Sequence, residues 1–407
     1  MHPFSNAVIQ QFNNFILCKN ILSNFLHTDS LNSEFPVTVI GGGLAGLSLS
    51  ILAAQAGYRV ALFEKEHYPF HKVCGEYISF ESYDFMKRLG LPLDAWQLPV
   101  IKKLELSDIK GRLYSFPLDM GGFGISRYTL DNALYKIAEK EGVHVFTGTK
   151  VNDIVFENDV HSLSAGTQKI SSSVCAAAFG KRTNLDVKWK RDFTLEKPNK
   201  LNNYIGVKYH IRYNYPIDTI ALHNFKNGYC GISNIEDGKC CLCYLTVAEN
   251  LSACGNSIKA MEEKILFQNP LLKKIFTGAE FLYEQPLAIS QISFSKKTQT
   301  EEHILMLGDA AGLITPLCGN GMSMAMHSAR LAFENIHLFL QKKMSRKEME
   351  GNYTKQWQQT FAMRLMAGRV VQKLTGNNFS TSAFLSLLGR FPFLASAIIK
   401  STHGERF

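Results

Sequence analysis

Two glycine-rich stretches contain the residues whose types and spacing could do chemistry. In the first, Gly41, Gly43 and Gly46 follow a strand-like run and open a helical one. Gly41 permits a tight turn, Gly43 lets a pyrophosphate approach the backbone, and Gly46 lets helix and strand pack closely. The free N–H groups and the positive end of the helix dipole favour an anion there. The spacing therefore predicts a dinucleotide-binding loop.

Glu64 ends the next strand-like run, where a dinucleotide-binding unit carries its acidic residue. A carboxylate at this place accepts hydrogen bonds from both ribose hydroxyls and repels a 2′-phosphate. This first unit predicts a dinucleotide cofactor without distinguishing NAD from FAD.

The second stretch distinguishes them. Asp309 stands just past a buried strand among small residues, where its carboxylate can bind the hydroxyls of a ribityl chain. The Gly-Asn-Gly that follows opens a helix, whose dipole would stabilise negative charge on a reduced flavin. We therefore predict FAD as the cofactor. The predicted contacts from this stretch are Gly308, Asp309, Pro316, Gly319, Asn320, Gly321 and Met322.

The elements around these stretches predict an α/β protein. Residues 37–40 and 59–63 are strand-like and flank a helical run, which together make a parallel β-α-β unit. Residues 304–307 predict a buried strand, and residues 204–247 a series of short antiparallel strands. A single helix is expected over residues 257–276. The expected fold is a Rossmann-type FAD-binding lobe with an inserted, mainly antiparallel β substrate lobe and a C-terminal helical segment.

The expected domains interleave along the chain. They are residues 1–35 as an N-terminal extension; 36–100, 120–185 and 290–375 as a discontinuous FAD-binding lobe; 101–119 and 186–289 as the β-rich substrate lobe; and 376–407 as a C-terminal helical tail.

Composition narrows the classes of protein. The net charge is +9, but the basic residues are scattered, and the densest cluster lacks the interleaved aromatic residues of a single-strand binder, so we predict no nucleic-acid partner. The nine cysteines include one Cys-x-x-Cys spacing, Cys240 to Cys243, and one His-x3-His spacing occurs, His67 to His71. The two pairs are far apart and in the wrong order for a zinc finger, and the cysteines lie in a strand-like run, so we predict small buried residues, no metal site and a reducing, cytoplasmic compartment. Residues 383–399 are apolar but broken by Arg390 and Pro392. They dock on the body, close over an apolar substrate, or rest on a membrane surface.

At this point the chain resembles a known family, the flavoproteins typified by para-hydroxybenzoate hydroxylase, and within it the geranylgeranyl-reductase-like branch. The two glycine-rich stretches match the family's FAD motifs, and residues 71–76 look like the branch's Lys-x-Cys-Gly-Glu segment. Arg127 matches an arginine that contacts FAD in the family. The resemblance covers about residues 35 to 375 and implies FAD, with NAD(P)H as the electron donor.

The chain departs from the family at three places. Residues 178–182, Ala-Phe-Gly-Lys-Arg, stand where the family has an Asp-Gly motif near the nicotinamide donor. Residues 227–233 stand where the branch has a Trp-x-Phe-Pro strand, so prenyl substrates are not assured. The absence of a Trp-x-Trp-x-Ile-Pro segment argues against a flavin halogenase.

Cys74 and Glu76 are the candidate catalytic residues, because the resemblance puts their segment near the flavin. The Cys74 thiol could protonate a substrate carbanion, or be a small buried residue at a tight turn. Glu76 could orient the substrate or act as a general acid, or be a solvated or capping carboxylate. His327 is expected to be a packing histidine.

Three functions fit this reading. The favoured one is an FAD-dependent oxidoreductase that reduces a C=C bond of a hydrophobic, prenyl- or polyketide-like substrate. The alternatives are an FAD-dependent monooxygenase, hydroxylase or epoxidase, that uses NAD(P)H and O2, and a non-catalytic lipid- or carrier-binding protein. The expected partners are the small hydrophobic substrate, a redox or carrier protein, and a membrane surface touched peripherally.

Overall fold

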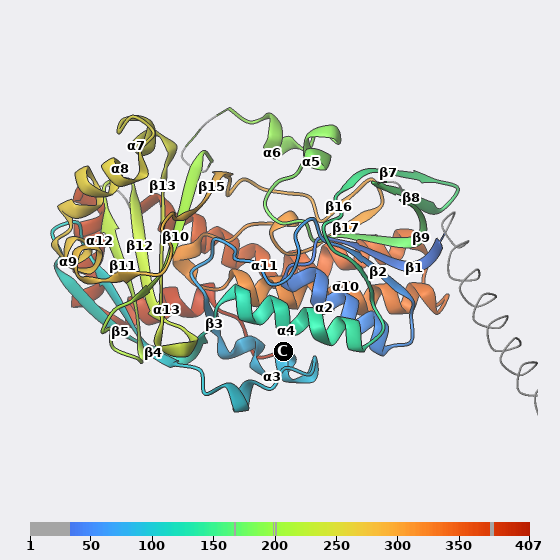
Figure 1. The fold of residues 1–407 in the computed structure, drawn as a ribbon, viewed down its shortest axis with the longest axis horizontal. Coiled ribbons are helices and arrows are strands. Elements are labelled where there is room, and N and C mark those ends of the chain that lie inside the picture. The colour runs from blue at the N-terminus through green and yellow to red at the C-terminus, as the bar shows by residue number, and fades with distance from the viewer. Residues whose placement is uncertain (1–32, 167, 198, 200–201, 375–377) are drawn as a thin grey trace, which may run out of the picture.

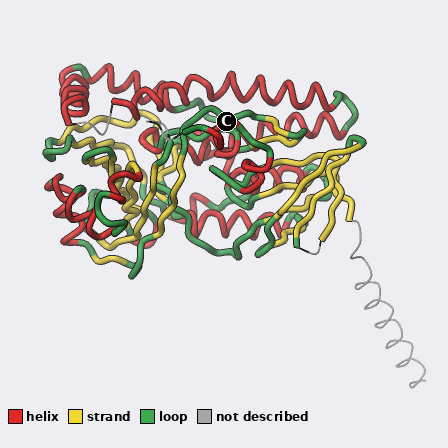
Figure 2. Tube along the Cα trace, turned by 90° about the horizontal axis from the view of Figure 1, so that it is seen from above, coloured by secondary structure: helices red, strands yellow, loops and turns green. Residues whose placement is uncertain are grey.

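The computed structural model describes residues 33–407, except residues 167, 198, 200–201 and 375–377. Two β-sheets stand at opposite ends of the molecule, with β10 to β13 at the left of Figure 1 and β1, β2 and β9 at the right. Helices run between the sheets, and Figure 2 shows long helices along one edge. The extension predicted for residues 1–35 lies outside the described residues apart from Ser33 to Phe35, which begin the first strand.

The first sheet places both glycine-rich stretches at one edge. Strand β1 (Ser33–Ile40) pairs in parallel with β2 (Val60–Phe63) on one side and β9 (Gln168–Ala177) on the other, and β9 pairs in parallel with β17 (Ile304–Met306). The carboxyl ends of parallel strands meet at the same edge, where such sheets bind ligands. The loops after β1 and β17 therefore open on the same side, which confirms the Rossmann-type lobe.

Helix α2 (Leu44–Gln55) follows the first glycine loop and is apolar on nearly every face. It is buried because it packs on β1 and β2 and is covered by α4 (Arg127–Lys140) and α10 (Gly321–Leu340). The rest of the sheet comprises β6 (His144–Phe146), β7 (Val151–Glu157), β8 (Val160–Ala165) and β16 (Thr300–Glu301).

The second sheet is mainly antiparallel, as predicted, with one parallel pair between β4 and β11. Its strands are β3 (Tyr77–Ser79), β4 (Val100–Ser107), β5 (Leu113–Gly124), β10 (Tyr204–Arg212), β11 (Thr219–Phe225), β12 (Gly228–Asn234), β13 (Cys240–Val247), β14 (Glu280–Phe281) and β15 (Leu287–Ile292). β3 and the end of β5 lie in segments that we expected in the FAD-binding lobe, so the two lobes share more chain than the predicted boundaries suggest.

The single helix predicted over residues 257–276 is wrong. The chain forms α8 (Ile258–Lys264) and α9 (Pro270–Gly278) instead. Asn269 caps α9 through its side-chain oxygen, which accepts from the N–H of Leu271 at 3.0 Å, and Pro270 has no N–H to continue a helix from α8. The other short helices are α3 (Tyr83–Arg88), α5 (Asn184–Lys188), α6 (Asp192–Leu195) and α7 (Ala248–Ser252).

The C-terminal segment is helical, as predicted: α11 (Arg346–Leu374), α12 (Asn378–Arg390) and α13 (Pro392–Thr402). α12 and α13 meet at a bend of 108° and pack against β5. Within the described residues no single helix is long and apolar enough to cross a bilayer, and this bent pair passes such a test only in combination.

Candidate functional site

The first glycine loop has the geometry that its sequence requires. Gly41 has φ +100°, and a Cβ there would lie 2.5 Å from the carbonyl oxygen of Ala178. A Cβ on Gly46 would lie 1.9 Å from the carbonyl oxygen of Gly41. Neither position therefore accepts a side chain. Gly43 precedes α2, and a Cβ there would face Lys72 Nζ at 3.6 Å and Arg127 Nη2 at 3.7 Å.

Two cations thus stand beside the N-terminus of α2, held by one carboxylate. Arg127 donates to Asp131 from Nε at 2.6 Å and from Nη2 at 2.7 Å, and Lys72 Nζ lies 3.2 Å from the same carboxylate. Burial would raise the pKa of Asp131, but Arg127 and Lys72 hold it below its usual value. The trio carries one net positive charge, which suits an anion such as a pyrophosphate at a helix N-terminus. Lys72 was not among the predicted contacts.

Glu64 supports the loop. Its carboxylate accepts from the N–H of Gly42 at 2.8 Å and from the N–H of Glu66 at 3.1 Å, and the Tyr68 hydroxyl donates to the carbonyl of Gly42. Each carboxylate oxygen has more than one acceptor site. Glu64 therefore keeps the capacity to accept from a ribose while it shapes the loop.

Asp309 offers an open carboxylate in the second stretch. Among the described residues none donates a hydrogen bond to this carboxylate. The turn itself is held in part by Ser328, whose hydroxyl oxygen accepts from the N–H of Gly308 at 2.9 Å. Burial raises the pKa of Asp309, although Lys297, Arg127 and Lys181 act in the opposite direction. A half-buried carboxylate with free acceptor sites fits the hydroxyls of a ribityl chain.

The backbone around Asp309 is fixed by three side chains from elsewhere in the chain. Lys297 donates to the carbonyl of Asp309 at 2.7 Å, Arg191 to that of Ala310 at 3.0 Å, and Gln299 to that of Ala311 at 3.1 Å. Lys297 also donates to the carbonyl of Lys181 at 2.7 Å, and burial lowers the pKa of Lys297 to about 8. Lys297 therefore links residues 178–182, which stand where an Asp-Gly motif was expected, to the second glycine-rich stretch.

The remaining residues of the second motif form the entry to α10. Pro316 starts a short turn and Gly319, with φ +66°, ends it. Gly321 begins α10 and Met322 is buried in its first turn. Asn320 donates from Nδ2 to the carbonyl of Thr402 at 3.1 Å, so it ties the motif to α13.

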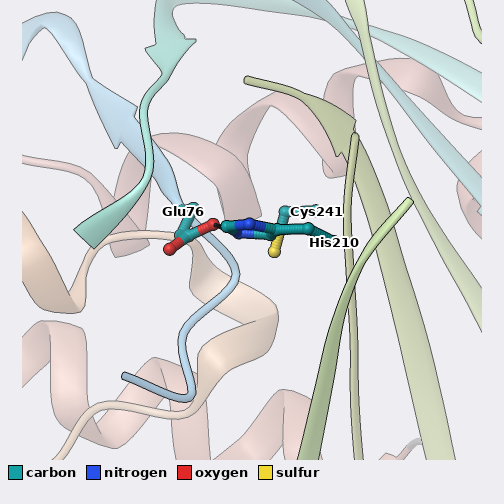
Figure 3. Close-up of side chains that lie close together, drawn as sticks. All are labelled: Glu76, His210 and Cys241. Carbon is teal, nitrogen blue, oxygen red and sulfur yellow. Dashed lines mark hydrogen bonds and ion pairs between the residues drawn. The ribbon is translucent and has the colours of Figure 1, made fainter. Parts of the chain in front are cut away.

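Glu76 is fully buried and joins the two lobes. It accepts from the N–H of Arg127 at 2.8 Å, from His210 Nε2 at 2.6 Å and from Lys208 Nζ, and Figure 3 shows its carboxylate pointing at the His210 ring. Burial would raise its pKa, but His210 and Lys208 together hold it below its usual value. The geometry matches a capping carboxylate at the start of α4 and makes Glu76 a poor general acid.

The cluster around Glu76 continues outward and does not favour a metal ion. His210 Nδ1 lies 2.7 Å from the Tyr283 hydroxyl, which lies 3.1 Å from His71 Nδ1. Ligand atoms of Glu76, His210 and Cys241 lie within 4.8 Å of one another. However, the Lys208 ammonium already neutralises Glu76, and burial raises the pKa of Cys241 well above its usual value. A cation there would meet a protonated thiol and a competing ammonium group.

Cys74 remains a candidate proton donor. Burial raises the pKa of its thiol, although Arg127 acts in the opposite direction. The thiol is therefore protonated near neutral pH and can give up a proton to a strongly basic carbon. Its backbone carbonyl accepts from Cys241 Sγ at 3.3 Å, which holds the segment against the second sheet.

An apolar cavity leads from the second motif into the space between the second sheet and the tail. The volume open to the centre of a water-sized molecule is about 100 Å³. Strands β4, β5 and β11 form one wall, α12 and α13 form another, and Pro316 to Gly319 also line it. The main apolar side chains are Leu104, Leu106, Phe116, Ile220, Leu222, Leu385, Leu388 and Ile398. The predicted tail thus docks on the body and also closes over an apolar space.

Comparisons with known proteins agree with this fold. A model of the NAD(P)-binding Rossmann-like domain matches residues 39–73. Conditioned medium factor receptor 1 of Dictyostelium discoideum is 24% identical over 92% of this chain and 75% of its own. A menaquinone reductase of Mycobacterium tuberculosis is 24% identical over 75% and 77% of the two chains. The solved structure of the flavin-dependent brominase Bmp2 has a TM-score of 0.72 and 18% identity, and the match covers 91% of this chain and 93% of Bmp2.

The fold is therefore the mixed α/β, Rossmann-type fold of FAD-dependent oxidoreductases. The prediction of an FAD-dependent oxidoreductase is supported at the level of the enzyme class by these relatives. They include both a reductase and a halogenase, so they do not select the geranylgeranyl-reductase-like branch or a reaction.

Proposed function

We propose that this chain holds FAD between its two glycine-rich stretches and reduces a C=C bond of a hydrophobic, prenyl- or polyketide-like substrate. The observation that carries the proposal is that residues 316–319, inside the second FAD motif, line the apolar cavity. A substrate bound there would lie against the part of the cofactor that reacts. Pockets of this kind are largely apolar with few polar groups, as this one is.

The chain's own residues would position the cofactor. Lys72 and Arg127 would face its pyrophosphate, Glu64 its adenosine ribose and Asp309 its ribityl hydroxyls. Bound FAD would supply the redox chemistry, taking electrons from NAD(P)H and delivering a hydride equivalent to the substrate. The cavity walls would exclude water from the reacting carbon atoms.

The proton that completes the reduction would come from Cys74 Sγ. The thiol is protonated near neutral pH because burial raises its pKa. Glu76 would act as a positioning residue, since its carboxylate binds the N–H of Arg127 at the start of α4 and so fixes the cation beside Gly43.

The monooxygenase alternative uses the same cofactor loops and the same cavity. It is supported by the likeness of the fold to a flavin-dependent brominase, since the fold is not confined to reductases. The two reactions differ in their products: reduction adds two hydrogen atoms, and monooxygenation adds one oxygen atom from O2.

A non-catalytic lipid- or carrier-binding protein is the second alternative. One relative whose match covers 92% of this chain is named as a receptor, which supports this alternative. A lipid- or carrier-binding protein on this fold would bind no flavin, or would bind a flavin that no donor reduces.

The first test is the visible spectrum of the purified protein under nitrogen, with NADPH and then dithionite added. A flavin spectrum near one equivalent that NADPH bleaches would support an enzyme with a nicotinamide donor. Substrate is then added without oxygen and its mass followed: a gain of two hydrogen atoms supports the reductase, and a product formed only with O2 supports the monooxygenase. A colourless protein that takes up no added FAD would refute both enzyme proposals.

A further inference from the structure

The C-terminal helices expose an unusual amount of apolar surface. Among the described residues, seven of the sixteen large hydrophobic side chains that are exposed lie between residues 363 and 393. Four of them, Met363, Met366, Val370 and Leu374, recur at helical spacing and so form one stripe along the end of α11. The side chain of Met363 is 68% exposed. An uncovered stripe of this kind indicates a contact surface.

The remaining three exposed residues mark the corner between α12 and α13. They are Leu387, Phe391 and Phe393, and Phe393 is 67% exposed. The corner is the 108° bend between the two helices, and the rings of Phe391 and Phe393 lie 6.1 Å apart. Because α11 contacts both α12 and α13, the stripe and the corner belong to one packed group of helices.

The charge of this group selects its partner. Residues 351–404 contain no Asp or Glu, and they contain six Lys or Arg residues. Arg364 and Lys400 pair with Glu81 and Asp119. The other four have no ion-pair partner among the described residues: Lys355, Arg369, Lys373 and Arg390. A second copy of the chain would bring the same positive charge, whereas an anionic lipid surface is complementary to it.

We propose that the stripe on α11 and the corner between α12 and α13 dock on an anionic phospholipid membrane. Phe391, Phe393 and Leu387 enter the interface between headgroups and acyl chains, while Lys373 and Arg390 contact lipid phosphates. This is a peripheral contact, since the helices lie on the bilayer and remain packed on β5.

The same helices separate the membrane face from the cavity. On the inner side of the corner Leu388 and Ala395 line the apolar cavity, and Gly389 lies against Tyr114, where a Cβ would be 2.7 Å from the ring. A lipid-soluble substrate could therefore pass from the bilayer past the corner into the cavity. This last step rests on the proposed function, but docking itself does not.

The test is sedimentation of the full-length protein with vesicles of phosphatidylcholine, with and without phosphatidylserine. We expect binding to the vesicles that contain phosphatidylserine and at least ~10-fold less to the neutral ones. The double variant Phe391→Ser/Phe393→Ser should bind roughly 10-fold more weakly, because two large apolar groups no longer enter the interface. Lys373→Gln/Arg390→Gln should bind about 30-fold more weakly at low salt, since each of the two cations near such a surface contributes on the order of 1 kcal/mol.

Ile217→Ser is the matched control. Ile217 is also 67% exposed but lies between β10 and β11, away from the C-terminal helices, so its replacement should leave vesicle binding unchanged. Equal loss in Ile217→Ser and in the phenylalanine variant would overturn the proposal. So would equal binding to neutral vesicles, or a concentration-dependent dimer that the phenylalanine variant abolishes without any vesicle binding. Sedimentation measures binding and requires no enzymatic turnover. A failure to bind vesicles can therefore be distinguished from a failure of the proposed FAD-dependent reaction.

Discussion

Replacing Glu76 by glutamine should destabilise the fold strongly. The variant removes the negative charge but keeps the shape, so the Lys208 ammonium, which is 0% exposed, loses its anionic partner and keeps only neutral acceptors, the new amide oxygen and the carbonyl of Lys72 at 3.1 Å. Breaking a buried pair in this way costs about 3–5 kcal/mol, because an uncompensated charge stays buried. We expect the free energy of unfolding to fall by about that amount, measured by urea unfolding at neutral pH.

Glu262 provides a matched control, since it is a second buried glutamate with different partners. Its carboxylate accepts from the hydroxyls of Tyr209 at 2.9 Å and Tyr244 at 2.8 Å, and burial raises its pKa. The amide oxygen of Glu262→Gln can accept both hydrogen bonds, so this variant should cost about 1 kcal/mol or less. The double variant Glu76→Gln/Lys208→Met should recover part of the loss, because it leaves neither member of the pair charged.

The pH dependence of the free energy of unfolding tests independently whether the Glu76 charge stabilises the fold. The pKa of Glu76 is lower in the folded protein than its ordinary value of 4.5, so its ionisation stabilises the fold above that pH. This stabilisation is lost as the pH falls through the folded-state pKa. The difference between wild type and Glu76→Gln should therefore shrink on acidification below 4.5. A loss in Glu76→Gln no larger than in Glu262→Gln, or a difference that does not change with pH, would refute the reasoning.

Three further predictions concern the cofactor and the cavity. Gly46→Val should purify without flavin, because its Cβ would meet the carbonyl oxygen of Gly41 at 1.9 Å. The control is Gly351→Ala on α11, where a Cβ meets nothing, and this variant should keep the visible absorbance of bound flavin. Asp309→Ala should weaken FAD binding by roughly 10- to 100-fold in titrations of the apoprotein, since a hydrogen bond to a charged group contributes about 1.5–3 kcal/mol; unchanged affinity would remove Asp309 from the site. Leu222→Trp should fill the cavity and raise KM for the substrate while reduction by dithionite stays the same; an unchanged KM would place the substrate elsewhere.

The β-α-β unit was predictable because its signals are local. The apolar strands, the glycine spacing and the terminal acid all lie within one short segment. Strand β9 was missed, although it is the central strand between β1 and β17. Its sequence contains Ser171, Ser172 and Ser173, which break the apolar run expected of a strand buried on both faces. The fold tolerates the fully buried Ser172 because its hydroxyl donates to the carbonyl of Val174 at 2.7 Å.

The partners of Glu76 were not predictable for a different reason. Lys208 and His210 alternate along β10, and polar residues with that period indicate a face open to solvent. The structure buries both side chains, because the segment that contains Glu76 lies against that face. A contact between residues so far apart in the chain leaves no trace in the local pattern.

The second FAD motif shows how a recognisable site depends on segments that carry no signal. Asp309 belongs to a motif that can be found in the sequence, but three donors from outside the motif hold its turn. Arg191 comes from the segment between α5 and α6, and Lys297 and Gln299 come from the segment between β15 and β16. Each donor binds one of three consecutive carbonyl groups, so we expect the loss of any one to loosen the turn that positions the Asp309 carboxylate. Tuning of the cofactor by this chain is therefore expected to reside in Arg191, Lys297 and Gln299 as much as in the motif itself.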